Sequence, residues 1–137
     1  MQIQQLNRTD AEKIFIIVEN KEGGALANED VVEWDSTNNA GISVEKADSA
    51  NAPNVAGVAI EAIADGAYGR IQIYGVHTAV ATNTTVTIAT ADASETTGDC
   101  VDASASTDQA ANLALAQFGH VVRVTDTNSS QIFLRCM

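Results

Sequence analysis

Apolar and polar residues alternate with a period of two along much of this chain, which is the pattern of strands buried on one face. The alternation is clearest in residues 68–75, where Ile71 and Ile73 share one face and Gln72 and Tyr74 share the other. Glycine, asparagine, aspartate and serine separate the alternating runs and predict turns between them. Similar runs occupy residues 13–20, 31–34, 41–47, 54–60, 84–90, 118–126 and 131–136.

About eight short strands at this spacing predict an all-β fold, either a small β-barrel or β-tulip-like body or a β-sandwich. A length of 137 residues is typical of one domain. The first dozen residues are polar, so we expect residues 1–12 to form an N-terminal arm ahead of a single β domain at residues 13–137. The last two strands, at residues 118–126 and 131–136, are expected to pair as a hairpin.

Two segments depart from the alternation. Residues 106–119 are rich in alanine and Thr107 could cap them, so one short helix near residues 107–117 is an alternative to a loop there. Residues 90–108 carry five acidic residues, no basic residue and almost no large apolar side chain. That composition predicts a long, solvated acidic loop.

Acidic residues outnumber basic ones by 18 to 7, which gives a net charge of -11. A surface this negative argues against binding to nucleic acid or to an anionic membrane. The basic residues lie mainly toward the two ends of the chain, among them Arg8, Lys13, Lys21 and Arg135. If the two ends fold together, these residues form a less negative face for a partner.

The chain begins with a polar segment, which cannot serve as the apolar core of a secretion signal. No apolar run approaches the ~20 residues that a membrane helix needs. These features predict synthesis in a cytoplasm. Two cysteines, Cys100 and Cys136, are too few for a disulfide scaffold, and both are expected to be reduced.

Residues with catalytic or metal-binding chemistry are scattered along the chain. His77 stands at the end of one strand pattern and His120 at the start of another, without a recognisable partner, so neither predicts general acid–base catalysis. The cysteines and histidines lack the close pairs of a structural zinc site. Residues 35–46 offer oxygen atoms at alternate positions, but Ala40 and Lys46 replace the glycine and glutamate of an EF-hand loop. We therefore expect no enzyme activity, no cofactor and no bound metal.

Residues 57–75 resemble a pattern found in tailed-phage capsid cement, or head decoration, proteins. In those proteins a G-V-A strand is followed by an I/L-A-x-G turn and a G-x-x-x-V/I-x-G strand. Asp65 and Gly66 supply a tight reversal, and the small residues allow neighbouring backbones to approach closely. The matching residues in this chain are Gly57, Val58, Ala59, Ile63, Ala64, Gly66, Gly69, Ile71, Ile73 and Gly75.

This resemblance implies a small β-barrel or β-tulip-like protein on the outer surface of a phage capsid, made in the host cytoplasm. It implies a homo-oligomer, commonly a trimer, that binds the major capsid protein and ties coat subunits together. A tail or fibre adaptor and a carbohydrate-binding β-sandwich module are the alternatives, and the second of these would normally present exposed aromatic side chains. The candidate interface residues are Gln2, Gln4, Arg8, Lys13, Lys21, Trp34, Arg70, Tyr74 and Arg135.

Overall fold

The computed structural model of the chain describes residues 12–37, 41–47, 54–81, 90–93, 100–102, 119–124 and 129–136. All regular secondary structure within these residues is strand, which confirms the predicted all-β class. The strands are β1 (Ile14–Asn20), β2 (Val31–Trp34), β3 (Ser43–Lys46), β4 (Val55–Ala59), β5 (Tyr68–Ala81), β6 (Thr90–Ala93), β7 (Cys100–Asp102), β8 (Gly119–Val124) and β9 (Ser129–Arg135). The helix considered at residues 107–117 and nearly all of the predicted arm lie outside the described residues.

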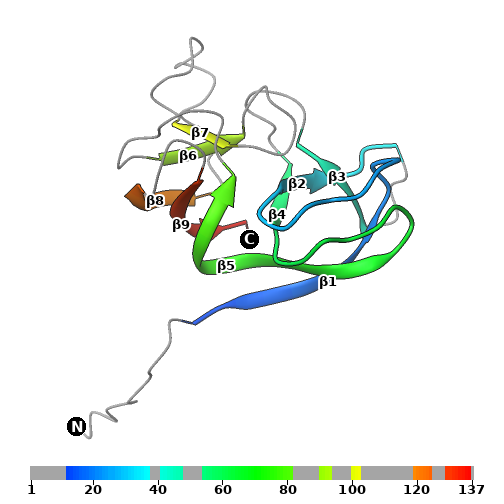
Figure 1. Cartoon of the computed structure of the whole chain (residues 1–137), viewed down its shortest axis with the longest axis horizontal. Coiled ribbons are helices and arrows are strands. Elements are labelled where there is room, and N and C mark those ends of the chain that lie inside the picture. Colours follow the sequence, from blue (N-terminus) through cyan, green and yellow to red (C-terminus); the bar gives the residue numbers. More distant parts are fainter. Residues whose placement is uncertain are drawn as a thin grey trace, which may run out of the picture.

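The strands pair in the order β1-β3-β2-β4-β5-β9-β8-β6-β7, and β1 also pairs with β5. The first five strands therefore close into a barrel, one of the predicted architectures. The other four strands extend from β5 as an open sheet (Figure 1), here called the extending sheet. β8 and β9 are antiparallel neighbours in it, as predicted for the last two strands.

Strand β5 belongs to both parts of the molecule. Its first half pairs with β1 and β4, and its second half, from Tyr74 to Ala81, pairs with β9. The alternation predicted an end near Gly75, but no turn residue interrupts residues 76–81 and the strand continues. Gly75 lies where the partner strands change, with a φ of 94°. A Cβ at this position would collide with the carbonyl oxygen of Glu12.

The closely apposed strands predicted in residues 57–75 are present. β4 and β5 are antiparallel, with Val58 opposite Gln72. A Cβ on Gly57 would lie 2.5 Å from the carbonyl oxygen of Gln72, so this backbone approach requires glycine. The reversal between the two strands includes Gly66, whose φ of 70° confirms the predicted turn position.

Two hydrophobic cores lie on opposite sides of the barrel wall. Successive side chains of a strand point to opposite faces, so neighbouring residues of β2 enter different cores. Val32 enters the core inside the barrel, and Val31 enters the core outside it. The barrel core contains Val18, Leu26, Val32, Val44, Ala56, Ile63 and Ile71. The second core, between the wall and the extending sheet, contains Val31, Ala47, Val58, Val80, Ile132 and Leu134.

Two expectations from the sequence are corrected. Gln72, placed on the polar face of its strand, is buried because the extending sheet covers that side of the barrel. Residues 90–108 are not a loop throughout, since β6 and β7 lie within them and pair antiparallel. Backbone hydrogen bonds do not require apolar side chains, so the acidic composition concealed these two short strands.

Candidate binding face and pocket

The outer side of β1 and β5 carries exposed apolar side chains. Ile17 is 68% exposed and Tyr68 is 63% exposed. In the β1–β5 register Ile17 lies opposite Arg70 and Glu19 lies opposite Tyr68, so these four side chains share one face of the sheet. Ile17 and Tyr68 are diagonal neighbours on it, within reach of each other for side chains of their size. We call these four residues the β1 face.

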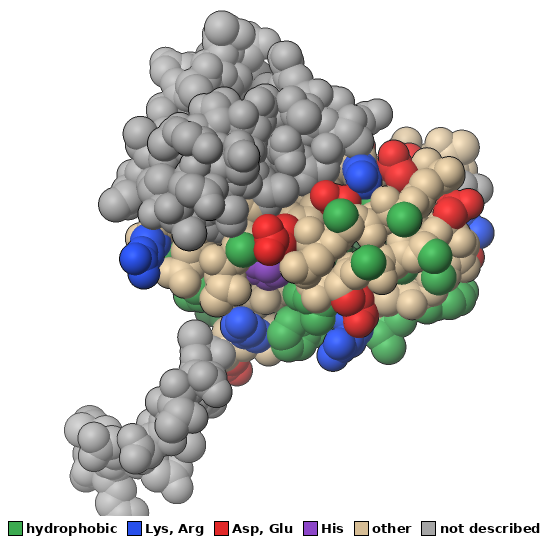
Figure 2. Space-filling view, viewed as in Figure 1, with side chains coloured by type: hydrophobic (Ala, Val, Ile, Leu, Met, Phe, Trp, Pro, Cys, Tyr) green, Lys and Arg blue, Asp and Glu red, His purple; other side chains and the backbone are tan. Residues whose placement is uncertain are grey.

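The cations on and beside the β1 face are each held by a carboxylate. Arg70 Nε lies 3.2 Å from Glu61 Oε1, and Lys21 Nζ lies 2.8 Å from Glu19 Oε1. The hydrogen bond from Arg70 lowers the pKa of Glu61, and the hydrogen bond to Glu19 raises the pKa of Lys21. Apolar surface therefore lies between balanced charges. Figure 2 shows hydrophobic side chains, with acidic and basic ones among them, along the side where β1 and β5 run in Figure 1.

The structure brings some of the predicted interface residues together and separates others. Lys13 and Lys21 flank β1 at its two ends, and Arg70 lies opposite β1 on its neighbour. Trp34 is half-buried and packs against the barrel core, so it is not fully available to a partner. The remaining candidates at the N-terminus lie outside the described residues: Gln2, Gln4 and Arg8.

Tyr74 and Arg135 lie opposite each other in the β5–β9 register, where the extending sheet joins the barrel. The Tyr74 ring meets Phe133 edge to face, with 5.2 Å between the ring centroids. Ile17 and Tyr68 were missed because the alternation treats apolar residues as buried. Residues 14–18 are apolar on both faces of the strand, but only one face of β1 is turned to the barrel core. The other face must then expose apolar side chains, so this run was the signal that could have identified Ile17.

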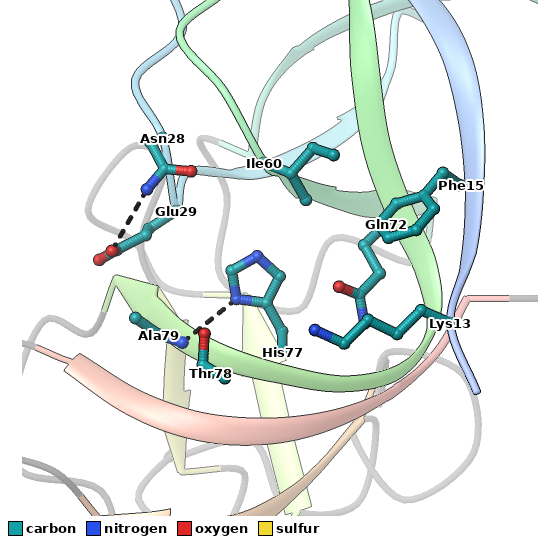
Figure 3. A pocket seen from close by; sticks show the side chains of 9 residues that line it. All are labelled: Lys13, Phe15, Asn28, Glu29, Ile60, Gln72, His77, Thr78 and Ala79. Atoms are coloured by element: carbon teal, nitrogen blue, oxygen red, sulfur yellow. Dashed lines mark hydrogen bonds between the residues drawn. The ribbon is translucent and has the colours of Figure 1, made fainter. Parts of the chain in front are cut away.

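A cavity of about 350 Å³ lies where the barrel meets the extending sheet (Figure 3). Its walls come from the start of β1, the connection before β2, the residue after β4, and both halves of β5. Polar groups from these segments converge on a space that also has an aromatic and an aliphatic wall. The lining residues are Lys13, Phe15, Asn28, Glu29, Ile60, Gln72, His77, Thr78 and Ala79.

His77 forms one side of this cavity and is only 7% exposed. Its Nδ1 accepts a hydrogen bond from the Ala79 N–H at 3.3 Å. Burial, together with the nearby Lys13 cation, lowers the pKa of His77. The ring is therefore neutral at pH 7 with its proton on Nε2, and Figure 3 shows that nitrogen pointing into the cavity.

Glu29 and Gln72 also line the cavity. Glu29 has a φ of 81°, a left-handed conformation that costs a non-glycine residue about 1–2 kcal/mol. Its N–H donates to the Ala59 carbonyl at 2.9 Å, and the Asn28 amide donates to its carboxylate at 3.4 Å. The Gln72 amide nitrogen donates to the carbonyls of Tyr74 (3.2 Å) and Gly75 (3.1 Å). Figure 3 shows the Gln72 side-chain oxygen turned toward the cavity.

Metal and thiol chemistry add little to these two surfaces. Among the described residues, no three histidine, cysteine, aspartate or glutamate side chains gather in a way that could hold a metal ion. Cys136 carries a thiol beside the second core, where burial raises its pKa to about 12. The side chain of Cys100 lies outside the described part of the chain. In the segments that the structure describes, no helix has the length and apolar character to cross a membrane.

Comparison with known proteins identifies a likeness in fold. No protein-family model matches the chain, and no curated protein matches its sequence. The structure is similar to the crystal structure of the N base of the head fiber gp8.5 in bacteriophage phi29, with a TM-score of 0.60 and 10% sequence identity. The likeness covers 91% of this chain and 96% of the other. At this identity the comparison establishes a shared fold.

Proposed function

We propose that this chain is a structural protein of a phage virion, held on the outer surface of the head through its β1 face. The observation that carries the proposal is the fold likeness to a head-fiber base, which extends over nearly the whole of both chains. The resemblance of residues 57–75 to capsid cement proteins supports the same location. The two arguments are separate, because one rests on the backbone as a whole and the other on a local sequence pattern.

The β1 face provides a physical basis for attachment. Ile17 and Tyr68 expose apolar surface on a chain whose net charge of -11 otherwise favours repulsion. Apolar area removed from water contributes roughly 25 cal/mol per Å², and tyrosine is often an energetic centre of protein interfaces. Arg70 is paired with the Glu61 carboxylate, so its positive charge is balanced and adds little repulsion of a basic partner surface. We propose the major capsid protein as the partner.

We further propose that several copies, in a trimer, attach together to neighbouring coat subunits. Once one copy is bound, the others meet their sites at high effective concentration, so individually weak faces give strong attachment. The N-terminal segment, with Gln2, Gln4 and Arg8, is proposed to add a strand to the sheet edge of a neighbour through backbone hydrogen bonds.

Two roles are compatible with this location. A cement protein ties coat subunits together, whereas the base of a head fibre anchors a projecting structure. The likeness to a head-fiber base is the observation that favours the second role. Osmotic shock of heads with and without the chain separates the two. Rupture of heads that lack the chain supports cement, and equal survival supports a fibre base.

Cosedimentation of the purified chain with heads that lack it tests the attachment face. Replacing Ile17 and Tyr68 together by serine is expected to weaken binding at least tenfold, because both side chains lose apolar contact. Val122→Ser is the matched control, since Val122 is 47% exposed but lies on β8 in the extending sheet. All three positions are exposed, so each substitution should change the free energy of unfolding by less than about 0.5 kcal/mol. Equal head binding by the double variant and the control would contradict the proposal.

A further inference from the structure

We infer that the cavity beside His77 is a binding site for a neutral carbohydrate. The first argument comes from buried polar atoms. Gln72 is 1% exposed and His77 is 7% exposed, yet among the described residues no hydrogen bond reaches the Gln72 side-chain oxygen or His77 Nε2. Both atoms face the cavity in Figure 3. Buried polar atoms almost always have a partner, so these two require one that enters the cavity.

The charges around the cavity select a neutral ligand. Lys13 and Glu29 are both lining residues and carry opposite charges, while burial keeps His77 neutral. A cationic ligand is opposed by Lys13, and an anionic ligand is opposed by Glu29. A hydroxyl group can pair with donors and acceptors alike, because it accepts a hydrogen bond from Lys13 or His77 and donates one to the Gln72 oxygen.

The apolar walls separate a sugar from water alone. Phe15 is 43% exposed, and it shares the cavity with the half-buried Ile60. Water gains nothing from such surfaces, whereas the C–H face of a sugar ring packs against an aromatic ring while its hydroxyl groups reach the polar wall. A volume of about 350 Å³ is at the lower end of the range for small-ligand sites, which suits a mono- or disaccharide.

The backbone at Glu29 indicates that the polar wall is held in place. Its left-handed φ of 81° is retained although an ordinary residue avoids it, and the hydrogen bond to the Ala59 carbonyl fixes it there. Backbone strain of this kind is concentrated at ligand sites, where it orients the groups that bind. The backbone at Glu29 therefore keeps this part of the cavity wall in place.

Titration of the isotope-labelled full chain with lactose, maltose and diacetylchitobiose, followed by backbone amide NMR, tests this site. At least one sugar is expected to give saturable shifts at His77, Thr78 and Ala79. Phe15→Ala should weaken that binding at least fivefold, and Thr78→Ala should weaken it less. Ile17→Ala is the matched control, because Ile17 is an exposed apolar residue of the same strand outside the cavity, and its affinity for the sugar should equal that of the unaltered chain.

Failure to shift these amides with any neutral sugar up to its solubility limit would overturn the inference and leave a cavity filled by water only. Tighter binding of glucuronate than of the neutral sugars would overturn it as well, as would equal binding by Phe15→Ala and Ile17→Ala. The site does not rest on attachment to heads. Weakened sugar binding in Phe15→Ala with full cosedimentation with heads would show that the two surfaces act separately.

Discussion

The barrel and the extending sheet share β5 but are stabilised in different ways. The barrel closes on itself and has its own interior core. It is also tied across its end by Asn20, whose amide donates to the carbonyls of Gly24 and Ile63, each at 2.8 Å. The extending sheet is open, and its core is completed by Val31 and Val58 from the barrel wall. The difference indicates that the extending sheet depends on the barrel wall to complete its core.

The largest expected effect comes from truncating one buried side chain in each core. Ile71→Ala removes a buried side chain from the barrel core and should lower the free energy of unfolding by about 3 kcal/mol. Because the extending sheet packs on the barrel, both regions should lose stability. Ile132→Ala makes a similar cut in the second core and should loosen the extending sheet more than the barrel.

Two native probes report the two regions separately. The single tryptophan, Trp34, packs against the barrel core, and Cys136 packs against the second core. Urea unfolding followed by Trp34 fluorescence should shift most in Ile71→Ala. Alkylation of Cys136, located by peptide mass mapping, should accelerate roughly tenfold or more in Ile132→Ala, because the buried thiol has a pKa of about 12 and reacts after opening. Identical responses of both probes to both substitutions would mean that the two regions open as one.

The next effect concerns the junction between the regions. Gly75→Ala should lower the free energy of unfolding by more than about 2 kcal/mol for two reasons. Alanine disfavours the left-handed backbone at this position, and its Cβ collides with the Glu12 carbonyl oxygen. Gly66→Ala is the matched control: its φ of 70° is similar, but nothing lies within 4 Å of the added Cβ. Chemical denaturation measures both. Equal losses would show that the contact with Glu12 adds nothing to the junction.

The smallest effect is a pH dependence at the same junction. Burial lowers the pKa of His77 in the folded chain below its ordinary value of about 6.5, so below that pH the unfolded chain binds the extra proton first. Stability should therefore fall as the pH drops below about 6.5, with a slope of at most about 1.4 kcal/mol per pH unit from this group. His77→Asn should flatten the curve of unfolding free energy against pH between 7 and 5. An unchanged slope would exclude His77 as the cause.

Much of the barrel was predictable because its strands encode one buried face by alternation. The runs that became β1, β2 and β3 were identified, and the Asp65–Gly66 turn was expected from its residue types. The burial of Gln72 was not, because it depends on a second sheet packing outside the barrel. Glu29 was equally hidden, since its residue type gives no indication of a left-handed backbone. Of the residues that line the cavity, only Lys13 was a candidate from the sequence, because the others come together from segments that are distant along the chain.

The continuity of β5 has a mechanical consequence. A force applied to the extending sheet along this strand is transmitted directly to the barrel, where β1 and β4 pair with the first half of β5 on either side. Hydrogen bonds on two edges then carry the load in shear, and many must break together before the strand slides out. The continuous strand is therefore expected to resist a force that pulls the barrel and the extending sheet apart along β5.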